Sequence, residues 1–449
     1  MPKKGTPEAC SNPLIEMKSQ DQPQDSGKLP SYPFPEGFLW GAATSSHQVE
    51  GDNRFNDWWE SEHEGRVPHR SGATCRHYEL FREDFDLARS WGHNAHRFSI
   101  EWSRVQPAPN RFDNEALRHY VEVVNVLNDR GMEPVVTLHH FTNPSWFARR
   151  GGWLSSDAPR VFNNYVERVV QNIGNRARFW LTINEPTVYV RQGYIAGQWP
   201  PFKSRGWRQA YAALHNLARA HRLSYRTIHQ AIPTPLVSFA HNAPVIEPCR
   251  ATAWSDRSAA TVRDFVLNRL FFRLIGRGCL DFVGINYYTR MVVRSQGNVT
   301  NRLLGSVCRA HGHAGQGPFS KIGWESYPQG LFEILQRFGR SGLPLLVTEN
   351  GIATDDEQVR TRFIEQHLKV ISQVIESGTN VIGYLYWTLM DSFEWTDGMG
   401  APFGLAAVDS KTQKRTPRPC VEELKRLFTS RRTEPQARRF VRSASGSNG

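Results

Sequence analysis

Short apolar runs that alternate with helical segments constrain the fold of this chain more than any other feature of its sequence. Eight runs are rich in β-branched and aromatic residues, and segments with helical periodicity lie between them. The runs are Phe38–Ser45, Asn94–Glu101, Glu133–Phe141, Arg178–Asn184, Leu236–His241, Asp281–Tyr288, Leu343–Glu349 and Val381–Leu389. The clearest helical segments are Ala116–Asn128, Ala158–Ile173, Tyr211–Ala231, Gly330–Phe338 and Gln358–Ser377. This alternation predicts an α/β fold, a single (β/α)8 TIM barrel with elaborated βα loops.

Several of the runs, for example PVVTL (134–138) and LPLLVT (343–348), are apolar without alternation. Such runs are typical of parallel strands that are buried on both faces. A doubly wound open sheet is the main rival fold. It is disfavoured because no GxGxxG turn follows the first run and because strand ends carry carboxylates.

The two ends of the chain differ in composition from its centre. Residues 1–33 are polar and rich in proline, and they lack the apolar segment of a secretory signal. Residues 429–449 are basic and end in a Ser/Gly-rich stretch. We expect a disordered or extended N-terminal tail, a barrel domain over residues 34–428, and a disordered C-terminal tail at 429–449.

Charge and cysteine content limit the partners to be expected. The net charge of +12 invites a nucleic-acid hypothesis, but no helix-turn-helix, zinc-finger or RNP pattern accompanies it. No apolar stretch approaches the roughly 18 residues of a membrane span. The six cysteines are scattered, without the spacing of a metal site or of a dense disulfide framework. We therefore predict no nucleic-acid or membrane partner, no metal site and a cytoplasmic location; the oligomeric state is left open.

Two glutamates stand at the ends of predicted strands, Glu185 after the fourth run and Glu349 in the seventh. Active-site groups of a barrel sit at the carboxyl ends of its strands, so these side chains should meet across the barrel mouth. Paired carboxylates are what glycoside hydrolysis requires. A separation of about 5–5.5 Å gives retention and about 6.5–9.5 Å gives inversion, and the sequence does not fix this distance.

Longer motifs make the pattern specific. They are FLWGAATSSHQVEG (38–51), RFSIEWSRV (97–105), TLHHF (137–141), TINEP (182–186), GINYYT (284–289), GWESYPQGL (323–331), VTENG (347–351) and YWTLMDSFEW (386–395). With these motifs in this order, residues 34–428 resemble the family 1 glycoside hydrolases, the β-glucosidase and β-galactosidase group.

The resemblance implies a retaining β-glucosidase that removes terminal non-reducing β-D-glucosyl residues through a covalent glycosyl-enzyme. Glu185 would be the general acid/base and Glu349 the nucleophile, with Arg97, Asn286 and Tyr288 as supporting groups. The expected partner is a small β-glycoside or oligosaccharide, and no cofactor is implied. The residues that match the family's substrate-binding positions are Gln48, His140, Asn184, Trp324, Trp387, Glu394 and Trp395.

Particular positions refine this prediction. An acid at Glu394 favours an unphosphorylated sugar, because a carboxylate would repel a phosphate. Phe141 and Pro402 depart from the commonest residues of the family, and the basic segment Lys203–Arg208 suggests a preference for acidic or polyphenolic leaving groups. The alternatives are a transglycosidase with the same intermediate and a catalytically silent glycan-binding barrel.

Overall fold

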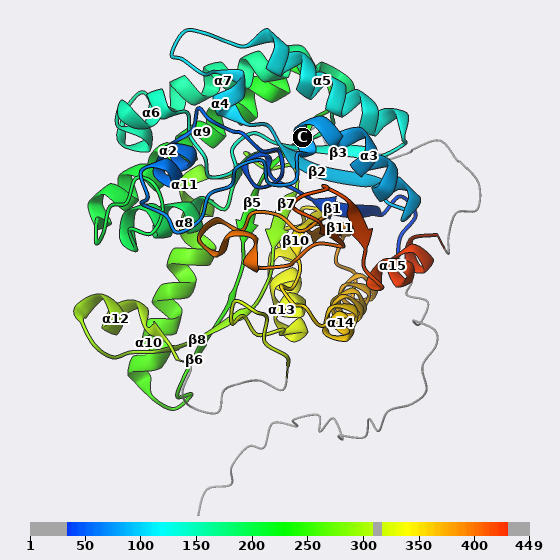
Figure 1. The fold of residues 1–449 in the computed structure, drawn as a ribbon. Helices are drawn as coiled ribbons and strands as arrows, with labels where there is room; N and C mark the ends of the chain where they lie inside the picture. Colours follow the sequence, from blue (N-terminus) through cyan, green and yellow to red (C-terminus); the bar gives the residue numbers. More distant parts are fainter. Residues whose placement is uncertain (1–33, 309–316, 430–449) are drawn as a thin grey trace, which may run out of the picture. The chain divides into compact units, whose positions relative to one another are not determined.

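A closed barrel of eight parallel strands forms the centre of the computed structural model, which describes residues 34–308 and 317–429 (Figure 1). The order around the barrel is β1-β11-β10-β7-β5-β4-β3-β2, and β1 pairs with both β11 and β2. The strands are β1 (Leu39–Ala43), β2 (Ala95–Ser99), β3 (Glu133–Thr137), β4 (Phe179–Asn184), β5 (Leu236–Asn242), β7 (Val283–Asn286), β10 (Leu345–Asn350) and β11 (Val381–Trp387). Six of the predicted runs contain one strand each, and the other two overlap β5 and β10, which end one residue later, so the predicted (β/α)8 barrel is confirmed.

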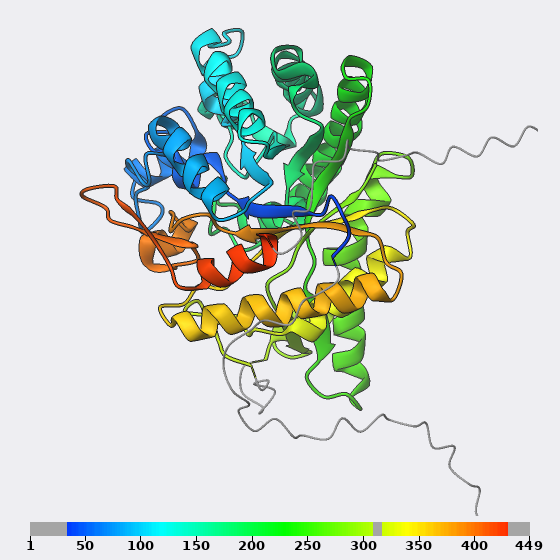
Figure 2. The same cartoon turned by 90° about the vertical axis from the view of Figure 1, so that its right-hand side faces the viewer.

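Helices surround the barrel in both views (Figures 1 and 2). All five clearest helical segments of the sequence are helices in the structure: α5 (Asn114–Asp129), α7 (Ala158–Ile173), α9 (Trp207–Ala231), α13 (Pro328–Gly339) and α14 (Glu357–Glu376). Local sequence sets where they begin and end. The Asp113 carboxylate accepts from the backbone N–H groups of Glu115 and Ala116 and caps α5, and Asp356 caps α14 in the same way. On α7 the side chains of Phe162, Val166 and Val169 are fully buried, as the helical spacing requires.

Further elements fill the connections after most strands. Those between β1 and β5 are α1 (Ser46–Val49), α2 (Asp57–His63), α3 (His77–Ser90), α4 (Trp102–Val105), α6 (Ser145–Arg149), η1 (Gly152–Leu154), η2 (Gly174–Arg176), α8 (Pro186–Val190) and the π-helix η3 (Arg191–Ile195). Those after β5 are β6 (Val245–Pro248), α10 (Trp254–Asp264), η4 (Phe265–Arg269), α11 (Leu270–Ile275), β8 (Arg290–Arg294), α12 (Val299–Leu304), β9 (Ser306–Val307), η5 (Trp395–Gly400), β12 (Ala406–Val408), β13 (Arg415–Pro417) and α15 (Cys420–Thr429).

The predicted elaboration of the βα loops is therefore also present. Strands β6, β8 and β9 form a separate three-stranded sheet, and β12 pairs with β13. The predicted tails lie outside the described residues, except that Thr429 ends α15. Within the described ranges, no helix is long and apolar enough to cross a membrane, and no three His, Cys, Asp or Glu residues group as metal ligands would.

Candidate active site

A cavity of about 220 Å³ opens at the carboxyl ends of the barrel strands. Ten of the twelve residues predicted for the site line it. They are Gln48, His140, Asn184, Glu185, Tyr288, Trp324, Glu349, Trp387, Glu394 and Trp395. The other two, Arg97 and Asn286, are fully buried and bond to residues that line it. The structure thus brings together all of the predicted site residues, from segments as far apart as Gln48 and Trp395.

Irregular backbone aims Glu185 into the cavity. The pairing of β4 with β5 shifts register between Leu181 and Asn184. Glu185 then adopts a left-handed conformation with φ of 43° directly before Pro186, the first residue of α8. A left-handed, non-glycine residue is uncommon and is held here by tertiary contacts, since the Glu185 N–H donates to the Ala240 carbonyl at 2.8 Å.

A similar irregularity precedes Glu349. Strand β10 shifts its register against β7 between Val347 and Glu349. Gly351 follows closely, and a Cβ atom at that position would lie 2.0 Å from the Trp387 carbonyl oxygen. The glycine of the VTENG motif is therefore required by the close approach of β11.

Arg97 on β2 organises the floor of the cavity. Its guanidinium donates to Glu349 Oε1 at 2.6 Å, to Asn184 Oδ1 at 2.7 Å and to the Thr137 hydroxyl at 3.0 Å. The side chain is fully buried, so these bonds compensate for a charge that would otherwise be costly to bury.

Glu349 accepts a second strong hydrogen bond, from the Tyr288 hydroxyl to Oε2 at 2.6 Å. Burial raises the pKa of Glu349 above its usual value, while the Arg97 charge and the bonds from Tyr288 and Arg97 act in the opposite direction. Both carboxylate oxygens are thus held by donors that favour the ionised form.

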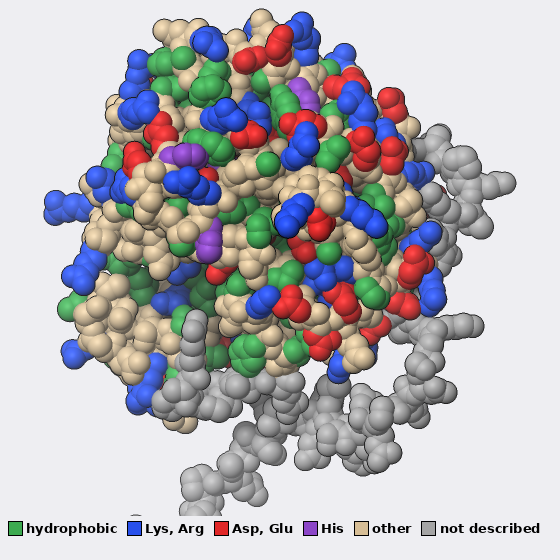
Figure 3. Space-filling view, viewed as in Figure 1, with side chains coloured by type: hydrophobic (Ala, Val, Ile, Leu, Met, Phe, Trp, Pro, Cys, Tyr) green, Lys and Arg blue, Asp and Glu red, His purple; other side chains and the backbone are tan. Residues whose placement is uncertain are grey.

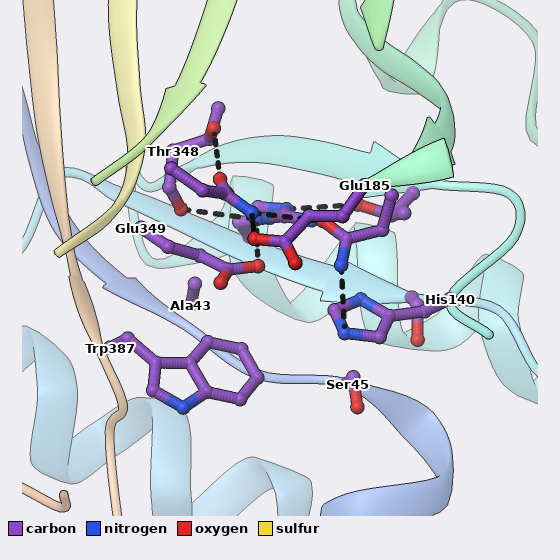
Figure 4. A network of polar contacts seen from close by, with 12 residues as sticks. Ala43, Ser45, His140, Glu185, Thr348, Glu349 and Trp387 are labelled. Carbon is purple, nitrogen blue, oxygen red and sulfur yellow. Dashed lines mark hydrogen bonds and ion pairs between the residues drawn. The ribbon is translucent and has the colours of Figure 1, made fainter. Parts of the chain in front are cut away.

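Glu185 lies in a different environment. Its Oε1 accepts from the amides of Asn286 at 2.8 Å and Asn242 at 3.0 Å, and no cation forms an ion pair with it within the described residues. Burial, and then the nearby negative charge of Glu349, raise the pKa of Glu185 to about 7. Figure 4 shows the two carboxyl groups directed into the same space.

Three parallel rings form one side of the cavity. The imidazole of His140 lies at 15° to the indole of Trp387 and at 12° to that of Trp395. Trp387 Nε1 donates to Glu394 Oε1 at 3.0 Å, and burial raises the pKa of Glu394 to about 8. Flat aromatic faces beside hydrogen-bonding groups suit the apolar faces and hydroxyls of a sugar ring.

The remaining predicted residues lie at the bottom and the mouth of the cavity. Gln48 is fully buried; its amide donates to the Phe393 carbonyl at 2.9 Å and accepts from Ser45 at 2.7 Å. Trp324 is 40% exposed at the mouth, with its ring centroid 5.2 Å from that of Tyr288. Phe141, one of the unusual positions, also lines the cavity.

Sequence reasoning missed Asn242 and Arg191, which both line the cavity. Asn242 is the last residue of β5, and the predicted strand ended one residue earlier. The rule that polar residues at strand ends are functional would have found Asn242. The same rule gives no signal for Arg191, which lies beyond α8. The basic segment Lys203–Arg208 does not line the cavity, so the charge near this rim comes from Arg191 instead.

Comparisons with known proteins agree with this geometry. The family model described as glycosyl hydrolase family 1 matches residues 31–279 and 272–432. The 1,4-beta-D-glucan glucohydrolase of Thermotoga neapolitana is 30% identical over 434 residues, which cover 85% of this chain and 99% of that protein. The beta-galactosidase of Pyrococcus woesei is 29% identical, over 86% and 94% of the two chains. The solved structure of a beta-glycosidase from Pyrococcus horikoshii superimposes with a TM-score of 0.83 and 40% identity, over 89% and 95% of the two chains.

Proposed function

The chain belongs to glycosyl hydrolase family 1, and from this premise we propose that it is a retaining β-glucosidase with Glu349 as nucleophile and Glu185 as general acid/base. The observation that carries the proposal is the contrast between two carboxyl groups in one cavity. Glu349 is paired with Arg97, whereas Glu185 has amide donors and a pKa of about 7. One group is thereby suited to attack as an anion and the other to give up a proton near neutral pH.

In the first step the Glu349 carboxylate attacks the anomeric carbon and forms a covalent glycosyl-enzyme. The bond from that carbon to the leaving oxygen breaks, and Glu185 protonates this oxygen. Since the negative charge of Glu349 is consumed in the ester, one cause of the raised pKa of Glu185 disappears. Glu185 then remains ionised and is ready for its second role.

In the second step the Glu185 carboxylate takes a proton from water, and the resulting hydroxide attacks the anomeric carbon. The bond to Glu349 breaks and its carboxylate is restored, so the product keeps the β configuration. The two carboxyl groups supply all of the proton and carbon chemistry, which requires no cofactor. We expect their separation to be about 5–5.5 Å, as retention demands.

The sugar is held by groups whose hydrogen bonds leave capacity for hydroxyls. His140 Nε2 lies 3.2 Å from the Asn184 amide nitrogen, and burial keeps the pKa of His140 well below its usual value. The imidazole is therefore neutral and accepts at Nε2, which places its proton on Nδ1. Nδ1 is buried without a hydrogen-bond partner in the described part of the chain.

Asn184 supports the reacting end of the sugar. Its Oδ1 is occupied by Arg97 and Asn286, so its amide N–H₂ is fixed toward the cavity and is suited to the 2-hydroxyl. Gln48 and Glu394 would bind the outer hydroxyls, and Trp387 and Trp395 would contact the ring. Trp324 at the mouth would contact the leaving group.

The test is aryl β-glycoside hydrolysis by the wild type, Glu185→Gln and Glu349→Gly, with product stereochemistry followed by NMR. We expect the β-anomer as first product and a higher kcat/KM for 4-nitrophenyl β-glucoside than for the galactoside or fucoside. Azide should restore Glu349→Gly with an α-glycosyl azide and Glu185→Gln with a β-glycosyl azide, which separates the two roles.

A matched control is Glu333→Gln on α13, whose carboxyl group lies outside the cavity and should not affect turnover. An α-anomer as first product would contradict the retaining mechanism. Folded wild type that binds sugars without cleaving any β-glycoside would point to a glycan-binding barrel, and transfer to added alcohols in preference to water would point to a transglycosidase.

A further inference from the structure

Arg191 is a cation at the wall of the cavity. It is the first residue of η3, six residues after Glu185, and it lines the same cavity. Within residues 34–308 and 317–429 its guanidinium forms no hydrogen bond or ion pair. The side chain is exposed through the cavity mouth, although the protein surrounds it on other sides. This burial lowers the pKa of Arg191, and the negative charge of Glu185 acts in the opposite direction.

The barrel topology places Arg191 opposite Gln48 and Glu394, two of the sugar-holding residues. Arg191 lies in the loop after β4, and the cavity residues Leu267 and Met291 lie after the next two strands in the barrel, β5 and β7. Gln48 and Glu394 lie after β1 and β11, on the other side of the barrel axis. Glu185, which would protonate the leaving oxygen, follows β4 on the same side as Arg191, so Arg191 faces the space of the leaving group.

The wall around Arg191 is otherwise mostly apolar. Val188, Leu267, Met291 and Ile322 line this side of the cavity. Gln192, next to Arg191, also lines it, and its Oε1 is buried without a hydrogen-bond partner in the part of the chain described. The Arg191 guanidinium therefore lies against a mostly apolar surface, which suits an aromatic ligand with a polar substituent.

Neighbouring charge strengthens the positive potential there. Burial, and then the charge of Arg191, lower the pKa of Arg263 on α10 to about 10, so the two cations repel one another. Figure 3 shows Lys and Arg side chains along the left edge of the molecule, over the side where α10, α11 and α12 lie, with few acidic side chains among them. An anionic group would find an attractive field on this side of the mouth.

We propose that Arg191 selects leaving groups that carry a carboxylate on an aromatic ring. The planar guanidinium matches the geometry of a carboxylate, and the apolar wall would contact the ring. This inference rests on the proposed function for catalysis, and it names a substrate class for the aglycone side of the same cavity.

The experiment compares two substrates that differ in charge, 4-carboxyphenyl and 4-carbamoylphenyl β-D-glucoside. The ratio of their kcat/KM values is measured for the wild type, Arg191→Gln, Arg191→Lys and the control Arg208→Gln, an exposed cation that does not line the cavity. Since both substrates use the same Glu185, any effect of Arg191 on that acid cancels in the ratio.

We expect the wild type to favour the carboxylate, and Arg191→Gln to lower the ratio about fivefold, as for an exposed ion pair. Arg191→Lys should keep part of the preference for the 4-carboxyphenyl substrate, and Arg208→Gln should keep all of it. In the wild type, 0.5 M salt should reduce this preference. An equal ratio in the wild type and Arg191→Gln would overturn the proposal.

Failure of the proposed catalysis gives a different result, because then neither substrate is cleaved by any variant. Calorimetric binding of the corresponding 1-thio-β-glucosides makes the same charge comparison without turnover. Equal affinity ratios for the wild type and Arg191→Gln in that measurement would also refute the role of Arg191.

Discussion

Replacing Tyr288 by phenylalanine removes one oxygen atom beside the proposed nucleophile. The Tyr288 hydroxyl donates to Glu349 Oε2 at 2.6 Å, and this bond stabilises the ionised carboxylate over its protonated form. A hydrogen bond to a charged group contributes about 1.5–3 kcal/mol. At about 1.4 kcal/mol per pKa unit, Tyr288→Phe should raise the pKa of Glu349 by about one to two units.

The sign of the effect on activity follows from the role of Glu349. The nucleophile must be ionised, so kcat/KM falls on the acid side as pH drops through its pKa. A higher pKa moves this acid limb upward, while the basic limb near pH 7, set by Glu185, moves little. The pH optimum of Tyr288→Phe should therefore be narrower, with a loss of about tenfold to a hundredfold below the acid limb.

The assay is a pH profile of kcat/KM for 4-nitrophenyl β-glucoside. The matched control is Tyr287→Phe, because the Tyr287 hydroxyl donates to the Tyr327 carbonyl at 2.6 Å and not to either carboxyl group. That variant should lose stability but keep both limbs. The reasoning is refuted if folded Tyr288→Phe has the acid limb of the wild type.

Three further changes test the site. Wild-type kcat/KM should fall as pH rises through about 7, since Glu185 then loses its proton. This basic limb of the pH profile should vanish in Glu185→Gln, assayed with 2,4-dinitrophenyl β-glucoside because its 2,4-dinitrophenolate leaving group departs without an acid. Asn242→Ala removes a donor to the ionised form of Glu185, so the basic limb should move upward by about one pH unit in the same profile. Gly351→Ala places a methyl group against the Trp387 carbonyl oxygen and should lower the free energy of unfolding by about 1–3 kcal/mol in urea titrations; an unchanged midpoint would contradict the close approach.

The sequence by itself was sufficient to predict the barrel fold. Runs such as Leu343–Glu349 carry the signature of strands buried on both faces, and helices such as α5 carry their periodicity and their N-terminal cap within a few residues. Because the carboxyl ends of parallel strands all meet at one face, a list of the residues at those ends already contains many that line the cavity, including Glu185, Glu349 and Trp387.

Only the tertiary structure decided how these groups differ from one another. Arg97 and Glu349 are 252 residues apart, and the 2.6 Å bond between them depends on closure of the barrel, which no local pattern encodes. The same closure places Asn242 on Glu185 and turns Arg191 toward the mouth. Charge, burial and hydrogen bonding act over a few ångströms in space and not along the chain, so the contrast between the two carboxyl groups emerges only from the fold.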